Sequence, residues 1–237
     1  MATEKRSRYG LLLLIGIIAF LSLSSNLWAE EPKFKNPNPV FKPLSPDEIE
    51  KAIPEKLGSR PALSGEEMEK IRAGKVVVRE RESSGEGKTY EAVAIVPFPP
   101  ASIVAFMRDY PAYVGIFPHL KKLTATWDGN VVHTENTIRV ALSSFNYKLN
   151  LLHYRDAMIE WEFVEGDIRD TRGYYKFFPY QGGKQTLLVY HVMTDPGLPI
   201  PQAILDLLTK SSMPDVIEAI RKEVARRAES AAPSSTP

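Results

Sequence analysis

The feature that most constrains the fold of this chain is a series of segments in which apolar and polar residues alternate. In one of them, Ile159, Trp161 and Phe163 alternate with Glu160 and Glu162. Alternation with a period of two places the apolar side chains on one face of a strand, which is typical of an antiparallel sheet with one covered side. Such segments, separated by turn residues, lie at 120–127, 131–142, 145–154, 157–164, 171–178 and 184–193.

The last part of the chain supplies a helix to cover this sheet. Pro214 marks its start, and Ile217, Ile220 and Val224 form an apolar stripe along residues 214–228. At 1.5 Å per residue this helix would be about 22 Å long, enough to cross several strands. Shorter helices are expected at 200–209, at 112–117 and after Pro100, where apolar residues recur with helical spacing.

The part of the chain before the long sheet segments combines two helices with a hairpin. Ser45 and Ser64 are each followed three residues later by a glutamate, which is the pattern of a capping box. Helices are therefore expected near 46–53 and 65–73, and hairpin strands at 75–82 and 89–96. Together with the meander and the final helix, this order of elements predicts an α+β fold in two layers.

Residues 1–29 have the pattern of a targeting segment. Basic residues precede an apolar run from Leu11 to Leu23, and Ala29 offers a small residue at a cleavage point. This pattern is typical of a secretory signal peptide, because the run is shorter than the roughly 20 residues that span a bilayer. We expect an exported protein, in the periplasm if the organism is a bacterium with two membranes. The alternative is an uncleaved N-terminal membrane anchor.

The rest of the chain divides into four parts. Five prolines between residues 30 and 46 predict an extended tether, because proline at this density permits neither a helix nor a central strand. Residues 47–74 form a short helical lead-in, and residues 75–228 form the main domain. Residues 229–237 are expected to be a disordered tail.

Composition excludes several classes of function. The chain has no cysteine, which excludes disulfides, thiolate metal ligands and a cysteine nucleophile. Its 30 Lys and Arg residues balance 29 Asp and Glu residues, so the charge gives no support for nucleic-acid binding. The four histidines lack metal-binding spacing, and no G-x-S-x-G nucleophile motif occurs. Neither a metal site nor a cofactor is expected.

Aromatic residues on the predicted sheet are a more informative feature. Most of them would belong to a packed core, but a single long helix on this sheet leaves a concave surface that it does not fill. A cavity lined by apolar and aromatic groups is the usual form of a small-molecule site. Arg139, His153 and His191 lie beside apolar neighbours and are candidates for an interior role. The pattern leaves the inward face of strand 131–142 open, because the apolar residues around Arg139 compete with it.

Three stretches of the chain resemble one known superfamily. They are the strand end 97–100 with the helix ASIVAFMRDYPAYVGIFPHLKKL after it, then IEWEFVEGDIRDTRGYYKFFPY (159–180), and finally GKQTLLVYHVMTDPGLPIP (183–201). Trp161, Gly166 and Gly173 are placed in the second stretch as in START-like domains. Over residues 75–228 the chain is similar to the START/Bet v 1-like (SRPBCC) superfamily, which includes polyketide cyclases and coenzyme Q-binding proteins.

The resemblance implies a helix-grip fold, in which a curved antiparallel sheet wraps around a long C-terminal helix and encloses a hydrophobic cavity. Members of the superfamily typically bind a lipid, sterol, isoprenoid or polyketide, and most of them bind or carry it. No catalytic residue is carried over, because the superfamily has no strictly shared catalytic motif.

The expected function is therefore that of an exported protein that binds or carries a hydrophobic small molecule, with transient membrane contact. One alternative is a cyclase or hydrolase that uses Arg139, His153 or His191 as acid or base. Another is an interaction module with a filled core. The residues expected to bind the ligand are Phe106, Phe117, Arg139, Tyr147, Leu149, His153, Trp161, Phe163, Tyr175, Phe177, Tyr190 and Ile217.

Overall fold

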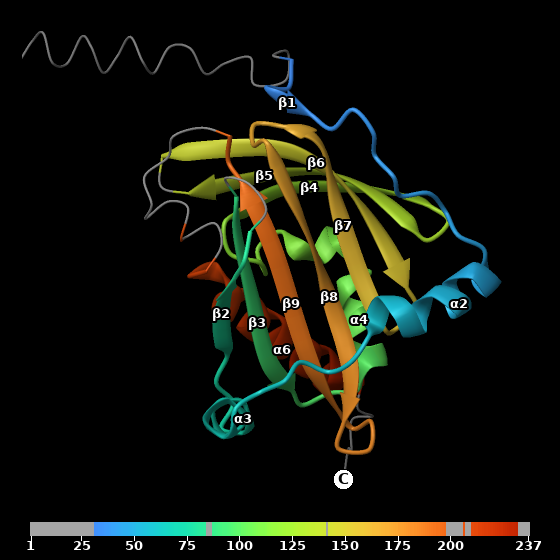
Figure 1. The fold of residues 1–237 in the computed structure, drawn as a ribbon, viewed down its shortest axis with the longest axis vertical. Coiled ribbons are helices and arrows are strands. Elements are labelled where there is room, and N and C mark those ends of the chain that lie inside the picture. Colours follow the sequence, from blue (N-terminus) through green and yellow to red (C-terminus); the bar gives the residue numbers. More distant parts are fainter. Residues whose placement is uncertain (1–30, 84–86, 141, 198–205, 207–209, 232–237) are drawn as a thin grey trace, which may run out of the picture. The chain divides into compact units, whose positions relative to one another are not determined.

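In the part of the chain that the structure describes, nine strands form one antiparallel sheet (Figure 1). The computed structural model describes residues 31–83, 87–140, 142–197, 206 and 210–231, and those from Lys33 onward belong to one unit. The strands are β1 (Phe34–Lys35), β2 (Val77–Arg81), β3 (Lys88–Val96), β4 (Leu120–Asp128), β5 (Val131–Val140), β6 (Ser143–Tyr154), β7 (Met158–Gly166), β8 (Asp170–Tyr180) and β9 (Gln185–Asp195). The helices are α2 (Pro46–Leu57), α3 (Gly65–Arg72), α4 (Pro100–Met107) and α6 (Ser212–Ala231), with a 3-10 turn η1 (Tyr110–Tyr113).

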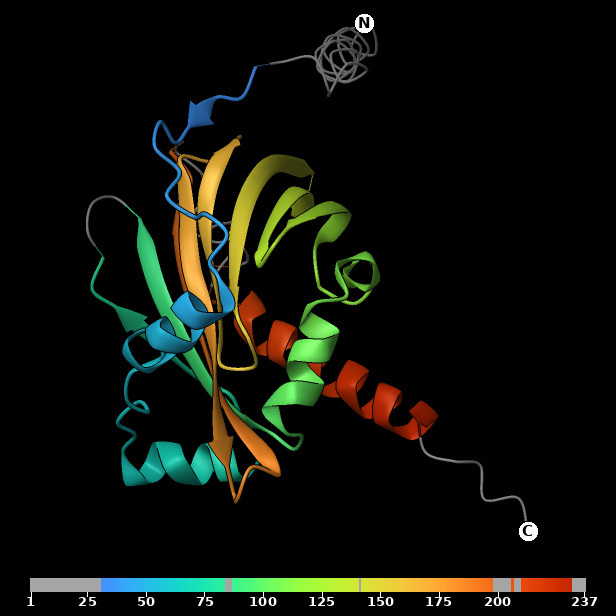
Figure 2. The same cartoon turned by 90° about the vertical axis from the view of Figure 1, so that its right-hand side faces the viewer.

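The strand order across the sheet is β2-β3-β9-β8-β7-β6-β5-β4, and β1 pairs with β7. Strands β4 to β9 are the meander that the alternation predicts, and the first hairpin joins it because β3 pairs with β9. Figure 2 shows the sheet curving around α4 and α6, while α2 and α3 lie on its other face. The α+β helix-grip fold is therefore confirmed.

The concave face of the sheet carries the main core. Ile103 and Phe106 of α4, together with Ile217 and Ile220 of α6, are fully buried against the strands. Their spacing of three residues places each pair on one face of its helix. Burial of side chains of this size stabilises the fold by about 1.5–3 kcal/mol each.

The prediction of a helix over 112–117 is wrong. The chain forms the 3-10 turn η1 at Tyr110–Tyr113 and then irregular turns. Gly115 has a φ of 92°, which is incompatible with a continuous right-handed helix. The result is a loop that carries Phe117 to the start of β4.

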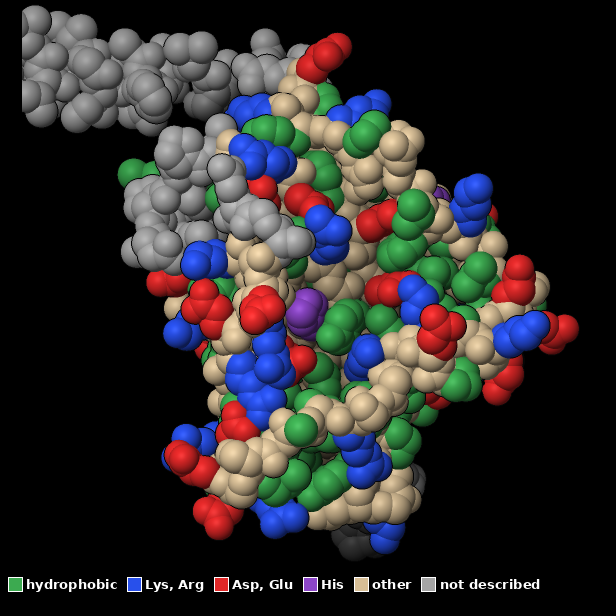
Figure 3. All heavy atoms as spheres, viewed as in Figure 1, with side chains coloured by type: hydrophobic (Ala, Val, Ile, Leu, Met, Phe, Trp, Pro, Cys, Tyr) green, Lys and Arg blue, Asp and Glu red, His purple; other side chains and the backbone are tan. Residues whose placement is uncertain are grey.

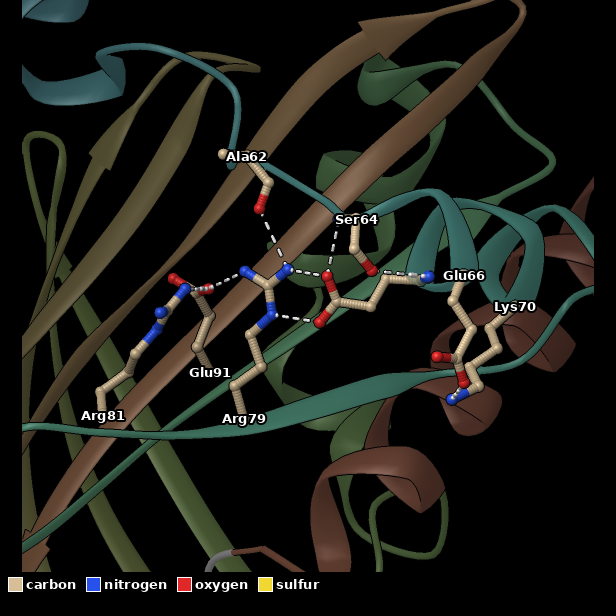
Figure 4. Close-up of polar contacts among 8 residues, drawn as sticks. Ala62, Ser64, Glu66, Lys70, Arg79, Arg81 and Glu91 are labelled. Carbon is tan, nitrogen blue, oxygen red and sulfur yellow. Dashed lines mark hydrogen bonds and ion pairs between the residues drawn. The ribbon is translucent and has the colours of Figure 1, made fainter.

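Helices α2 and α3 lie on the outer face and begin at the predicted capping boxes of Ser45 and Ser64. Helix α3 is tied to the sheet through Arg79 of β2 (Figure 4). The Arg79 Nε donates to Glu67 Oε1 at 2.7 Å, and the same guanidinium lies 3.9 Å from the carboxylate of Glu91 on β3. The two helices therefore leave the concave face to α4 and α6.

The proline-rich segment is extended, as expected, but it is also fixed to the sheet. We call residues 33–44 the strap. The Asn36 amide donates to the Val164 carbonyl oxygen at 2.7 Å, and the Val40 and Phe41 amides donate to the Glu162 carboxylate at 2.9 Å each. These bonds could not be predicted from the sequence, because they join residues more than a hundred positions apart.

Several expectations concern the ends of the chain. The signal segment at 1–29 lies outside the described residues, as does the expected helix at 200–209 apart from Asp206. Helix α6 runs to Ala231, so residues 229–231 are helical and not part of a disordered tail; the rest of the expected tail lies outside the described residues. Among the described residues, no helix has the length and apolar character needed to span a membrane.

Candidate functional site

A cavity of about 230 Å³ lies between the concave face of the sheet, the loop after η1 and the start of α6. Most of its wall is apolar or aromatic. The lining residues are Met107, Tyr110, Tyr113, Phe117, Pro118, His119, Leu120, Leu123, Thr134, Asn136, Ile138, Tyr147, Leu149, Leu151, Ile159, Trp161, Ile168, Thr171, Tyr175, Tyr190, Val192, Thr194, Ser212 and Val216.

Six of the residues predicted to bind the ligand lie on this wall. The rings of Tyr175 and Tyr190 stack at 4.5 Å between centroids, and Trp161 lies 5.4 Å from Tyr175. These three side chains come from the neighbouring strands β7, β8 and β9 and form one aromatic wall. The six residues are Phe117, Tyr147, Leu149, Trp161, Tyr175 and Tyr190.

Four other predicted residues are apolar and do not line the cavity. They are almost fully buried in the surrounding core, because their side chains are covered by α4, α6 or neighbouring strands. On α6 the neighbouring residue Val216 reaches the cavity instead. The four residues are Phe106, Phe163, Phe177 and Ile217.

The prediction of an interior role for Arg139 is wrong. On β5 the residues Thr134, Asn136 and Ile138 face the cavity, so Arg139 points to the opposite face. Its side chain is exposed, and its Nε donates to Ser144 Oγ at 3.4 Å. The inward face of this strand, which the sequence left open, is therefore the even-numbered one.

His153 is buried but lies behind the cavity wall. Its Nε2 is 2.7 Å from the Tyr110 hydroxyl, and Tyr110 lines the cavity. Burial, with a smaller contribution from the positive charge of Arg108, lowers the pKa of His153 to about 3. The imidazole is therefore neutral at physiological pH and is a weak base.

His191, the third candidate for acid–base chemistry, lies on the outer face of the sheet. It stacks on Tyr174 with 4.7 Å between ring centroids and an interplanar angle of 5°. Burial lowers its pKa. Only the Tyr110–His153 pair therefore joins a predicted acid–base residue to the cavity.

The polar groups that line the cavity were missed by the sequence analysis. The Asn136 Nδ2 donates to Thr134 Oγ1 at 2.8 Å and to the Tyr147 carbonyl oxygen at 3.4 Å. Across the cavity, Thr171 Oγ1 donates to the Met193 carbonyl oxygen at 3.1 Å. Each of these residues lies at an inward-facing position of its strand. Alternation along β5 would have identified Thr134 and Asn136 if the inward face of that strand had been known.

The described part of the cavity wall carries no Asp, Glu, Lys or Arg side chain. Burial raises the pKa of the Tyr147 hydroxyl, and it raises the pKa of the Tyr190 hydroxyl to about 12. Burial and a hydrogen bond to Tyr190 likewise raise the pKa of Tyr175. The phenols are therefore uncharged donors. Within the described ranges no group of three or more acidic, His or Cys side chains is placed to hold a metal ion.

Comparison with known proteins identifies the family. Residues 96–221 match the family described as "Polyketide cyclase / dehydrase and lipid transport", a match that covers more than half of the chain. The chain belongs to this family. No curated protein matches the chain in sequence.

Solved structures agree with this assignment at the level of the fold. The Zhui aromatase/cyclase from Streptomyces sp. R1128 is 18% identical, with a TM-score of 0.54. The alignment covers 62% of this chain and 99% of the aromatase/cyclase chain. The STAR-related lipid transfer protein from Xanthomonas axonopodis is 14% identical, with a TM-score of 0.54 and coverages of 63% and 93%. A START superfamily protein from Mycobacterium smegmatis is 17% identical, with a TM-score of 0.51 and coverages of 59% and 98%.

Proposed function

We propose that this protein binds and carries an uncharged hydrophobic small molecule in the internal cavity. The observation that supports this most directly is the cavity wall, which is apolar apart from hydroxyl, amide and imidazole groups and has no charged side chain among its described residues. Burial of an unpaired charge in such a wall is strongly unfavourable, whereas burial of an apolar surface gains about 25 cal/mol per Å². A sterol-like or isoprenoid alcohol fits this chemistry.

The family assignment and the fold support the same class of ligand. The family description names lipid transport, and a lipid transfer protein shares the fold. The cavity volume of about 230 Å³ is slightly below the range of about 300–1,000 Å³ that is usual for small-molecule sites. The pattern of residues 1–29 further supports the proposal that the protein is exported. Fractionation of cells that express the full chain tests its location.

Native mass spectrometry of the purified protein, followed by solvent extraction, tests the binding proposal. We expect one uncharged hydrophobic molecule bound per chain. A Leu149→Trp variant should lose this molecule, because the larger side chain fills the cavity, whereas Leu149→Met should retain it. Absence of any bound molecule, together with no binding to a panel of lipids and isoprenoid alcohols, would contradict the proposal.

A cyclase is the second candidate, and the Tyr110–His153 hydrogen bond is the observation that favours it. The neutral imidazole and the phenol could pass a proton between them at the cavity wall. The low pKa of His153 makes it a weak base, which favours a ligand carrier over an enzyme. If His153→Gln abolished turnover of a polyketide substrate and left its affinity unchanged, the cyclase would be the better account.

A further inference from the structure

The outer face of the sheet carries a second hollow, on the opposite side from the cavity. Figure 3 shows this face, which is hollowed over β7, β8 and β9. The strap forms one wall of this outer groove, through residues 35–41. On β9, His191, Met193 and Asp195 line the groove, while the alternate residues of the same strand line the inner cavity.

Strand β7 departs from this strict division between the two faces. Trp161 and Phe163 point to the concave side by alternation, and Trp161 lines the inner cavity. Both residues also line the outer groove. Inward-facing side chains can be reached from the outside only through a gap in the sheet, so the groove enters the sheet beside β7.

The pairing of the strands locates this gap. Strands β7 and β8 are paired from Met158↔Lys176 to Trp161↔Gly173, and no pair between them follows Trp161 in this fully described region. Farther along β7, Glu165 pairs with Lys35 of β1 instead. The opening between β7 and β8 therefore begins at Trp161.

The Trp161 indole lies at the start of this opening and lines both the cavity and the groove. A Cβ atom added to Gly173 would lie 2.5 Å from Trp161 Cζ2 and 2.7 Å from Cη2, so the ring lies directly against the Gly173 backbone. Only 7% of Trp161 is exposed. One aromatic side chain thus separates the inner cavity from the outer groove.

We propose that the ligand site continues through the sheet: when Trp161 turns aside, a ligand longer than the inner cavity extends one end between β7 and β8 into the outer groove. This inference rests on the proposed function and extends it to elongated molecules with an apolar body and an uncharged polar end. A charged end gains little there, because the two arginines that line the groove are already paired with its carboxylates. Arg169 lies 3.2 Å from Asp195, and Arg172 lies 2.7 Å from Asp170.

Binding of geraniol, farnesol and geranylgeraniol tests this inference, because these alcohols share one end group and differ in chain length. In Trp161→Ala we expect the affinity for geranylgeraniol to rise about tenfold, while that for geraniol changes less than twofold, because only the longer chain reaches the opening. Leu123→Ala is the matched control, since it enlarges the cavity on β4, at the edge of the sheet away from β7 and β8.

Because the chain has no native cysteine, labelling of a single introduced cysteine provides a second test of the inference. In the Trp161→Ala background, Arg172→Cys places a single thiol in the groove, and reaction with a bulky maleimide should remove the gain for geranylgeraniol. Thr126→Cys, on the distant strand β4, should leave the gain intact after labelling. A gain that survives the groove label, or that is no larger than in Leu123→Ala, would overturn the inference. Failure of the wild-type protein to bind any of the three alcohols would instead overturn the proposed function, and this inference with it.

Discussion

Asn136 shows at the scale of a single residue how the cavity could select a ligand. Its amide nitrogen is already used by Thr134 and by the Tyr147 carbonyl oxygen. The amide oxygen has no hydrogen-bond partner among the described residues and remains available to accept from a ligand hydroxyl. Because the surrounding wall is apolar, this one bond would distinguish an alcohol from a hydrocarbon of the same shape.

Asn136→Leu should therefore weaken the binding of farnesol about fivefold, which corresponds to the net contribution of about 1 kcal/mol for one hydrogen bond. The binding of farnesene, which lacks the hydroxyl, should be unaffected. Calorimetry or fluorescence titration measures both. Arg139→Ala is the matched control on the opposite face of β5 and should change neither affinity. Equal losses for farnesol and farnesene would contradict this role of Asn136.

The burial of His153 has a consequence for stability. Its pKa is about 3 in the folded protein and 6.5 in the unfolded chain, so the unfolded chain takes up the proton first as the pH falls. The contribution of neutral His153 to stability is complete above pH 6.5 and is lost as the pH falls from 6.5 toward 3. Burial also lowers the pKa of His191, which adds a slope of the same sign.

Urea unfolding at pH values from 7.5 to 5 measures this effect. The free energy of unfolding should fall by up to about 1.4 kcal/mol per pH unit for the His153 contribution, and His153→Gln should remove that part of the slope. His133→Gln replaces an exposed histidine on β5 and should retain the slope. If the two variants showed the same pH dependence, His153 would not be the source.

The sequence could predict the identity of inward residues only where both faces of a strand differ clearly in polarity. On β7 the contrast between Trp161 and Glu162 is unambiguous, and the placement of Trp161 on the cavity wall was correct. On β5, polar residues occupy two of the inward positions, so the polarity of its two faces left the inward face open. The distinction between a cavity-lining and a core residue depends on packing across the molecule, which alternation does not contain.

The strap is the element whose role was least visible in the sequence. Its prolines predicted an extended conformation, and its attachment depends on Glu162, which accepts from two strap amides and from Asn150 Nδ2 at 3.1 Å. Local capping boxes and alternating strands were predictable because each is contained within a few neighbouring residues. The Val40–Glu162 contact joins residues more than a hundred positions apart, and no local pattern encodes it.

Glu162→Gln should loosen the strap, because a neutral amide replaces a charged acceptor and hydrogen bonds to charged groups contribute about 1.5–3 kcal/mol. Hydrogen exchange at the Val40 and Phe41 amides should accelerate about tenfold or more. Glu165→Gln serves as the control, since its contact with the strap is a weak one: Lys35 is 70% exposed and lies 3.9 Å away, while the closer partner of Glu165 is Lys148 of β6 at 3.0 Å. Unchanged exchange in Glu162→Gln would show that other contacts hold the strap.

At the scale of the whole molecule, a curved sheet, two inner helices and an outer strap leave one internal space with an uncharged wall among the described residues. The two-layer α+β fold followed from the order of the elements, and its helix-grip form followed from the family resemblance. The chemistry of the space follows from which residues share the concave face. The central claim is that this space accepts neutral hydrophobic molecules and rejects charged ones of the same shape.

The comparison of farnesol with farnesoate at pH 8 tests this claim most directly. Farnesoate has the same apolar body but carries a carboxylate, and the described residues of the wall include no Lys or Arg to pair with it. We predict that farnesol binds one to one and at least about a hundredfold more tightly than farnesoate. Equal affinity, or a preference for farnesoate, would contradict the account.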